Sequence, residues 1–120
     1  MKEFERHHGD SFQLGWDEKT IPFALLSILP HEGIHGQPLL SGLLVDSIRR
    51  RQGYATDLIY KAERLLEREG FSRVFAVVHP ENMATRKLFQ KLGYTEMILM
   101  EKQWKPLDIR QPRLAEWIRI

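Results

Sequence analysis

The chain contains no cysteine and has no long apolar run. The first absence excludes a disulfide framework, a zinc knuckle and a thiol nucleophile, and it agrees with a reducing compartment. The second excludes a membrane span, which needs about 18 consecutive apolar residues. The charged start Met-Lys-Glu-Phe-Glu-Arg also lacks the apolar centre of a signal peptide. We therefore expect a cytoplasmic protein without a membrane partner.

Length and charge narrow the class of protein further. A chain of 120 residues is large enough for one hydrophobic core and too short for two, so we expect a single domain over residues 1–120. The net charge is +2, but most lysines and arginines lie after residue 48. That part of the chain favours an anionic partner, and charge alone does not choose among nucleic acid, acidic lipid and a phosphorylated cofactor.

The first part of the sequence has the pattern of strands and turns. Residues 11–16 and 22–29 are apolar stretches separated by Asp17-Glu18-Lys19-Thr20, which predicts two strands around a turn. Residues 30–38 are rich in glycine and proline and predict a loop. Residues 39–45 are a short apolar run, and their length predicts a buried strand.

A helical pattern follows, with apolar residues at helical spacing: Ala55, Leu58, Ile59, Ala62, Leu65 and Leu66. Gly70 is placed to end this helix in a left-handed conformation. Residues 74–78 are an unbroken apolar run, typical of a strand covered on both faces. Strand, helix and strand together predict a parallel βαβ unit.

The remaining sequence predicts a second helix and two late strands. Asn82 can begin the helix and Gly93 can end it. Residues 94–104 predict a strand, and residues 114–120 a weaker one. The fold class is α/β, with a mixed, mostly antiparallel sheet around a central parallel βαβ unit.

The junction between the strand at residues 39–45 and the long helix carries the clearest chemical signal, in Arg50-Arg51-Gln52-Gly53-Tyr54-Ala55. Unpaired backbone N–H groups at a helix N-terminus bind anions, and Gly53 with the small Ala55 would let a pyrophosphate approach the main chain. The string resembles the motif of the GNAT superfamily of acetyl-CoA-dependent N-acetyltransferases, which is Arg or Gln, two residues, Gly, one residue, then Gly or Ala.

The resemblance continues through a second motif at residues 82–94, where Leu88, Lys91, Leu92 and Gly93 match the family. It covers about residues 39–104, which would be the cofactor-binding part of a GNAT-like fold. It implies acetyl-CoA as co-substrate and no metal. The implied cofactor-binding residues are Leu43, Val45, Arg50, Arg51, Gln52, Gly53, Tyr54, Ala55, Thr56, Asn82 and Phe89. Leu43 and Val45 would act through their backbone groups.

Two departures from the family concern the catalytic groups. Phe89 stands where many members have a tyrosine that protonates the departing thiolate, and a phenyl ring has no proton to give. The strand at residues 39–45 lacks the glutamate that often deprotonates the acceptor. His79 follows the strand at residues 74–78 and is the predicted replacement base, with Asp46 and Glu81 as weaker candidates.

A third departure is at the N-terminus. The family usually has a strand and two helices before the first hairpin, whereas about ten residues precede Ser11 here. Two explanations stay open, a shortened member completed by a second copy in a homodimer, or a fragment of a longer chain.

Three other functions compete with acetyl transfer to a primary amine of a small molecule or peptide. His31-Glu32-Gly33-Ile34-His35 has the H-E-x-x-H spacing of a zinc peptidase, but that site needs a helix and this string lies among glycines and prolines. The basic excess allows nucleic-acid binding, although no recognised motif accompanies it, and we expect no nucleic-acid partner. The absent tyrosine and glutamate also fit a sensor that binds acyl-CoA without turnover.

Overall fold

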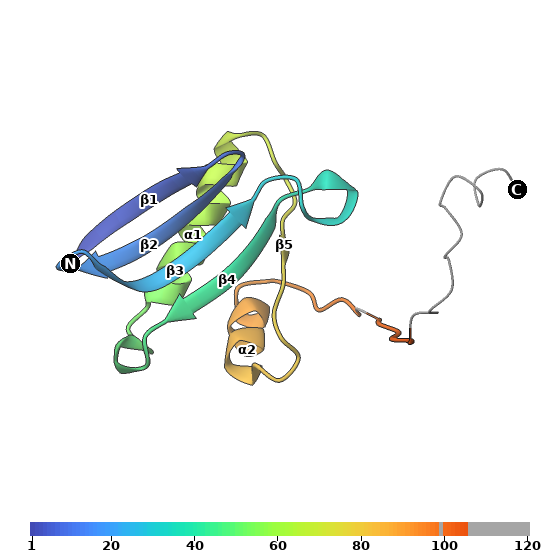
Figure 1. Cartoon of the computed structure of the whole chain (residues 1–120). Coiled ribbons are helices and arrows are strands. Elements are labelled where there is room, and N and C mark those ends of the chain that lie inside the picture. Colours follow the sequence, from blue (N-terminus) through green and yellow to red (C-terminus); the bar gives the residue numbers. More distant parts are fainter. Residues whose placement is uncertain (99, 106–120) are drawn as a thin grey trace, which may run out of the picture.

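A computed structural model describes residues 1–98 and 100–105, and its strands form one sheet in the order β1-β2-β3-β4-β5 (Figure 1). The strands are β1 (Lys2–His8), β2 (Ser11–Glu18), β3 (Ile21–Leu29), β4 (Leu39–Val45) and β5 (Phe75–Ala76). Neighbouring strands are antiparallel except β4 and β5, which are parallel. The predicted fold class, a mixed and mostly antiparallel sheet with one parallel unit, is confirmed.

The strand β1 is absent from the sequence-based prediction. It pairs with β2 along its whole length, from Lys2 opposite Asp17 to His8 opposite Ser11. Phe4 is the only apolar residue of this strand, so no apolar alternation marks it. β1 is the edge strand of the sheet, and its charged residues oppose pairing with other chains.

The helix α1 (Tyr54–Arg68) packs on one face of the sheet and lies behind β2 and β3 in Figure 1. Its apolar stripe joins the strands in the core, which consists of Leu14, Phe23, Ala24, Leu26, Ile28, Leu40, Leu58, Ile59, Ala62, Leu66 and Phe89. Gly70 adopts φ +93° just after the helix, as predicted. Burial of this shared apolar surface holds α1 against the sheet.

The helix α2 (Met83–Lys91) begins at Asn82 and is followed by Gly93 at φ +95°. The Asn82 side chain accepts a hydrogen bond from the Thr85 N–H at 3.2 Å, so the predicted start and end of the second helix are confirmed. None of the helices among the described residues is long and apolar enough to span a membrane.

Two predicted strands differ from the structure. β5 contains only two residues, and Val77 directly after it is 59% exposed, so residues 74–78 are not a strand covered on both faces. Residues 94–98 and 100–104 form no strand. Tyr94 and Glu96 bond instead to Glu63 of α1 and Arg86 of α2, which holds the start of this segment against the helices. The strand predicted at residues 114–120 lies outside the described residues.

Tyr94 provides a test of this arrangement. Its hydroxyl donates to the Glu63 carboxylate at 2.9 Å, and burial together with this bond raises the pKa of Tyr94. Tyr94→Phe should lower the free energy of unfolding by about 1 kcal/mol near neutral pH, since the bond is partly screened by solvent.

The pH dependence of the Tyr94 contribution has a definite sign. The folded state keeps the phenol proton that the unfolded state loses near pH 10, the ordinary value. The contribution is therefore complete below pH 10 and falls as pH rises from there through the raised pKa. Urea titrations of both proteins at pH 8 to 11 should converge at high pH, and a difference that does not change with pH would contradict this.

Candidate functional site

β4 and β5 separate after a short stretch of pairing (Figure 1). The Phe75 N–H donates to the Pro38 carbonyl at 2.9 Å and the Val77 N–H to the Leu40 carbonyl at 3.1 Å. Beyond these bonds, no further β4–β5 pair occurs in the described part of the chain, although β4 continues to Val45. We use the name cleft for the place where β4 continues without β5 as a partner, so it is defined by the backbone pairing alone. It lies at the carboxyl ends of parallel strands, where ligands of open α/β sheets bind.

A bulge in β4 lies beside the cleft. Leu25 pairs with Leu44 while Ser27 pairs with Ser41, so β4 contains one more residue than β3 over this stretch. Gly42 lies in the bulge with φ +65°, a conformation that favours glycine. Sequence reasoning missed this feature, although a glycine inside an apolar strand is a signal for a bulge.

The bulge determines which backbone groups of β4 face the cleft. The Asp46 N–H donates to the Phe23 carbonyl at 2.8 Å and therefore points toward β3. Because the backbone groups of successive residues point to opposite sides of a strand, those of Val45 and Leu43 point away from β3. These are the two residues predicted to bind the cofactor through their backbone, and the structure turns them toward the cleft.

The N-terminus of α1 provides unpaired donors at the same end of the sheet. Gly53 precedes the helix with φ +89°, and the first helical hydrogen bond runs from the Asp57 N–H to the Gly53 carbonyl at 2.9 Å. The N–H groups of Tyr54, Ala55 and Thr56 have no hydrogen-bond partner among the described residues. Three such donors at the positive end of a helix dipole form an anion-binding site.

The side-chain position of Gly53, directly before these donors, is open. A Cβ atom added to Gly53 would meet no heavy atom within 4 Å. The Tyr54 ring lies elsewhere, because it packs edge to face on Phe23 with 4.9 Å between ring centroids. The Tyr54 ring is thus held against the strand β3, and Tyr54 contributes its backbone N–H to the donor group.

Two predicted binding residues hold the loop before α1. The Arg50 Nε donates to the Val45 carbonyl at 3.1 Å, and the Gln52 amide donates to the Ile48 carbonyl at 3.4 Å. Arg51 has φ +63° and its side chain is exposed. Arg50 thus links the end of β4 to the loop, and a ligand that binds the Val45 carbonyl would share this acceptor with Arg50 or displace it.

A polar cluster that sequence reasoning missed anchors the first turns of α1. The Trp16 indole donates to the Asp57 carboxylate at 2.9 Å, and Lys61 pairs with the same carboxylate at 2.8 Å. Lys61 also pairs with Glu3 of β1. Burial alone would lower the pKa of Lys61, but its hydrogen bonds to Asp57 and Glu3 outweigh that effect and raise it. The N-terminal part of α1 is thereby fixed to the sheet.

His79 lies in the turn between β5 and α2. Its Nδ1 accepts a hydrogen bond from the Glu81 N–H at 3.2 Å, and its carbonyl accepts one from the Asn82 N–H at 2.9 Å. In a neutral ring an accepting Nδ1 implies that the proton is on Nε2. The ring therefore presents its Nε2–H donor to solvent. Its Nδ1 can accept a proton only after the hydrogen bond from the Glu81 N–H is broken.

Arg86 stabilises the turn that carries His79 and Asn82. Its guanidinium donates to the Pro80 carbonyl at 2.8 Å and pairs with Glu96 at 2.8 Å. The bond to Arg86 lowers the pKa of the Glu96 carboxyl. The exposed Asn82 caps α2 at the edge of this turn, so its predicted cofactor contact is compatible with its capping role.

Phe89 is a core residue. Its side chain is 6% exposed and packs edge to face on Tyr94, with 4.8 Å between ring centroids. A ring buried to this degree has little surface for a ligand. The contact between Phe89 and the cofactor stays a prediction.

The H-E-x-x-H string at residues 31–35 does not form an α-helix. Only a 3-10 turn at Ile34–Gly36 occurs there, and His35 adopts φ +57°. Within the described residues, no group of three or more His, Asp or Glu side chains is arranged to hold a metal ion. The helix that a zinc peptidase site needs is therefore missing.

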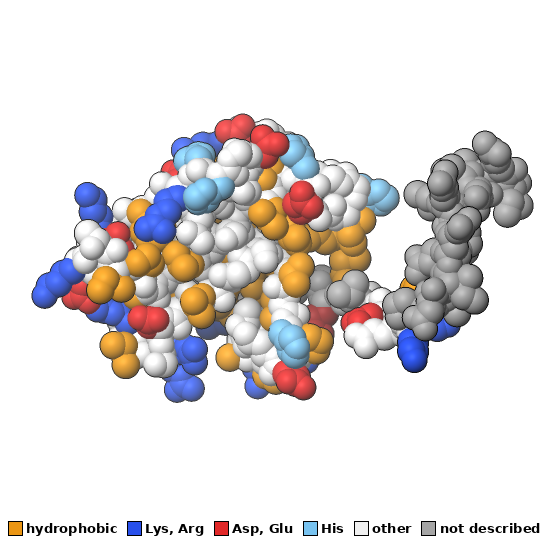
Figure 2. Space-filling view, in the orientation of Figure 1, with side chains coloured by type: hydrophobic (Ala, Val, Ile, Leu, Met, Phe, Trp, Pro, Cys, Tyr) orange, Lys and Arg blue, Asp and Glu red, His pale blue; other side chains and the backbone are white. Residues whose placement is uncertain are grey.

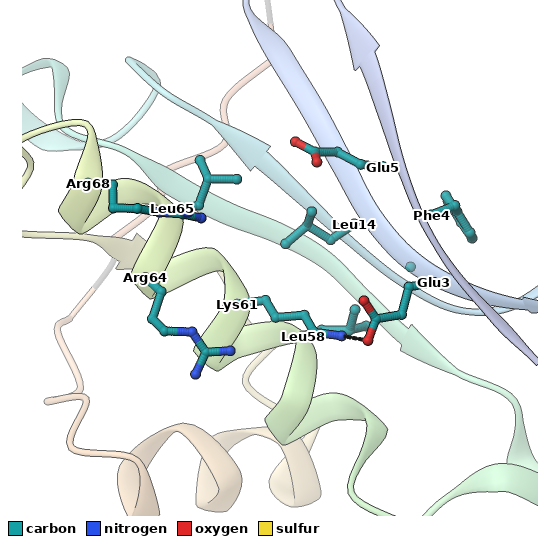
Figure 3. Close-up of a pocket in the computed structure, with 10 residues that line it drawn as sticks. Glu3, Phe4, Glu5, Leu14, Leu58, Lys61, Arg64, Leu65 and Arg68 are labelled. Carbon is teal, nitrogen blue, oxygen red and sulfur yellow. Dashed lines mark hydrogen bonds and ion pairs between the residues drawn. The ribbon is translucent and has the colours of Figure 1, made fainter.

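A separate hollow lies on the face of the sheet that α1 covers, between β1 and α1 (Figure 3). It has a volume of about 410 Å³, with Leu14 and Leu58 at its floor and Glu3, Lys61 and Arg64 at its rim. None of the predicted binding residues lines it. The hollow therefore does not coincide with the cleft, and the cleft remains the candidate site.

Comparison with known proteins shows to which family the chain is similar. The model of the acetyltransferase (GNAT) family matches residues 2–94. No curated protein matches the sequence significantly.

Solved structures show the same fold at low sequence identity. An aminoglycoside antibiotic 6'-N-acetyltransferase from Acinetobacter haemolyticus is 20% identical, with a TM-score of 0.65 over 84% of this chain and 74% of that chain. An aminoglycoside N-acetyltransferase in complex with CoA is 20% identical, with a TM-score of 0.67 over 83% and 79%. A transcriptional regulator from Bacillus halodurans is 14% identical, with a TM-score of 0.67 over 82% and 68%.

Proposed function

The chain belongs to the GNAT acetyltransferase family, and from this premise we propose that it transfers an acetyl group from acetyl-CoA to a primary amine. The proposal takes residues 1–120 as one acetyltransferase domain acting in the cytoplasm. The observation that carries it is the combination of three unpaired N–H groups at the start of α1 with the backbone groups of Leu43 and Val45 that face the cleft.

Acetyl-CoA fits this combination in two ways. Its pyrophosphate would lie on the N–H groups of Tyr54, Ala55 and Thr56, beside the open position at Gly53. Its pantetheine arm would pair with the backbone of Leu43 and Val45 as an added strand does. Arg50, Arg51 and Gln52 lie in the loop between these two parts, and Asn82 lies on the other side of the cleft.

The bound co-substrate supplies an acetyl thioester, and the chain would position an amine against it. The amine nitrogen bonds to the acetyl carbon, the carbon–sulfur bond breaks, and CoA leaves as thiolate. Direct attack by the amine needs no covalent enzyme intermediate, and the chain has no cysteine that could carry one. Holding both reactants in line lowers the barrier by up to about 7–11 kcal/mol. We propose that His79 accepts the ammonium proton, directly or through water. The second nitrogen proton passes to water once the new carbon–nitrogen bond has formed, and solvent protonates the thiolate.

The second candidate function is an acyl-CoA sensor without turnover. Two observations favour it: Phe89 is buried and has no acidic proton, and the Nδ1 of His79 already accepts a hydrogen bond. A sensor would bind acetyl-CoA through the same groups and release no CoA.

Release of CoA thiol distinguishes the two functions. The purified protein is incubated with acetyl-CoA and amino acids, polyamines, amino sugars or peptide N-termini, and the acetylated product is identified by mass spectrometry. Thiol release that depends on an amine, together with the product, supports the enzyme. Calorimetric binding of acetyl-CoA without any product would support the sensor, and absence of binding would contradict both.

We also propose that the protein forms a homodimer. Its described surface includes a group of exposed apolar side chains from the segments after β5 and α2, namely Val77, Met97, Ile98, Met100 and Trp104. A second copy would cover such surface. Sedimentation at micromolar concentration should show a dimer, and a stable monomer would contradict the proposal.

A further inference from the structure

The hollow between β1 and α1 is a second recess of the molecule, apart from the cleft (Figure 3). Strands β2 and β3 lie between β1 and β4 in the sheet, so the hollow and the cleft are on opposite sides of it. Figure 2 looks onto the face away from α1, where charged side chains lie mostly toward the rim, and the hollow is on the side hidden from that view. Its volume of about 410 Å³ is within the range of small-molecule sites.

An ion pair closes one end of the hollow. Lys61 of α1 pairs with Glu3 of β1, as the dashed line in Figure 3 shows, and it also pairs with Asp57 at 2.8 Å. The two walls therefore meet here without a ligand. Because the one lysine serves both carboxylates, this end of the hollow offers no free cation to a ligand.

The other end of the hollow stays open, although charged residues line it. Glu5 lies two residues further along β1 than Glu3, an advance of about 6.6 Å. Arg64 and Arg68 line the hollow from α1, and their spacing of four residues places them on the same helix face. Neither arginine forms an ion pair with another described residue, and the described partner of Glu5 is His7 of its own strand, at 3.3 Å. A carboxylate on one wall and two guanidinium groups on the other therefore remain unbridged.

Between these charges the hollow has an apolar floor. Leu14 and Leu58 are buried beneath it, and Leu65 is half-buried between the two arginines of α1. In Figure 3 the Leu65 side chain lies between Glu5 and Arg68. The alkyl stems of the arginines add further apolar surface, while their charged ends reach the rim. A ligand in this position would meet an apolar surface with a carboxylate on one side and guanidinium groups on the other.

We propose that the hollow binds a free α-amino acid with an aliphatic side chain, such as leucine. Its ammonium group would pair with Glu5 and its carboxylate with Arg64 and Arg68. Its side chain would lie against Leu65. The bound molecule would thereby join the two walls at the open end, as Lys61 joins them at the closed end. This inference goes beyond acetyl transfer and does not depend on it, because none of the residues proposed to bind acetyl-CoA lines the hollow.

The arrangement of charges favours a zwitterion over ligands with charge of one sign. A simple carboxylic acid or a phosphate would match the two arginines but would be repelled by Glu5 and leave it unpaired. A polyamine would match Glu5 but would be repelled by Arg64 and Arg68. A molecule with both charges close together matches both walls, and the apolar floor favours an aliphatic side chain over an acidic one.

Calorimetry of the full chain in the absence of acetyl-CoA tests the proposal with the unmodified protein. Leucine should bind. The analogue without the amine, 4-methylpentanoate, and the analogue without the carboxylate, 3-methylbutylamine, should each bind at least about 10-fold more weakly, the loss expected for one charge-assisted hydrogen bond. Glycine keeps both charges but has no side chain, and it should also bind more weakly than leucine.

Variants of the two walls locate the bound leucine. Arg68→Gln and Glu5→Gln each remove one charge, and each should weaken leucine binding by at least about 10-fold. Lys87→Gln is the matched control, because Lys87 is an exposed cation of α2 outside the hollow and its loss changes the net charge as Arg68→Gln does. The control should keep the affinity of the unmodified protein. All three substituted side chains are exposed, so the variants should fold, and thermal unfolding checks this.

Three results would overturn the proposal. They are absence of leucine binding at millimolar concentration, equal affinity for leucine and 4-methylpentanoate, and leucine binding that neither Arg68→Gln nor Glu5→Gln weakens. The last result would place the leucine elsewhere, as at the cleft where the amine acceptor is proposed to bind. The comparison of ligands uses the unmodified protein, so it decides the proposal even if a variant does not fold.

Discussion

Gly53→Val is expected to weaken acetyl-CoA binding by at least about 100-fold, the loss expected for two charge-assisted hydrogen bonds. The valine side chain would stand directly before the three unpaired N–H groups at the start of α1, at a position where an added Cβ meets no described atom. A pyrophosphate could then no longer approach these donors. Isothermal titration calorimetry with CoA and with acetyl-CoA measures the effect.

The structure offers a matched control at the other end of the same helix. Gly70 has φ +93° against +89° for Gly53, and an added Cβ meets nothing within 4 Å at either position. Valine in this left-handed conformation costs about 1–2 kcal/mol of stability at both positions. Gly70→Val should therefore be destabilised to the same degree and keep its affinity for CoA. Equal affinities of the two variants would contradict the proposed position of the pyrophosphate.

Two of the elements that border the cleft, β4 and α1, were readily predicted from the sequence. The long helix follows from its apolar spacing, and the glycines at residues 53 and 70 mark its two ends. The strand at residues 39–45 follows from a short apolar run between loop residues. These patterns are local, because each depends on residues within one or two turns, and the family motif lies at the junction between them.

The features that depend on distant contacts were missed. β1 has one apolar residue, and its pairing with β2 determines its conformation. Val77, directly after β5, is exposed because no other described element covers it. The apolar content of residues 74–78 does not show whether such a covering element exists. The bulge at Gly42 requires the register of β3, and that register decides which backbone groups of β4 face the cleft.

In the candidate site, too, local sequence patterns were sufficient to identify residues but not to show their contacts. Sequence alone placed Gly53, Leu43 and Val45 near one another, but it did not show that Arg50 already bonds to the Val45 carbonyl. It also identified His79 by position and reference pKa, without the hydrogen bond that its Nδ1 accepts from Glu81. That bond bears directly on whether His79 can act as a base.

His79→Ala is expected to lower kcat by about 100-fold or more with an amine acceptor, the usual contribution of a general base. The affinity for acetyl-CoA should change little, since the proposed pyrophosphate donors belong to α1. The loss should be largest near neutral pH and smaller at high pH, where the amine is already deprotonated. Steady-state kinetics over pH 6 to 10 measures both effects.

Asparagine at the same position separates proton transfer from loop structure. The side-chain oxygen of His79→Asn can occupy the place of Nδ1 and accept the Glu81 N–H, so the turn before α2 is kept. Asparagine cannot take up a proton at these pH values. If His79 is the base, the Asn variant will be as slow as the Ala variant. If asparagine restores activity, His79 serves only to hold the turn, and the base must be solvent or another group.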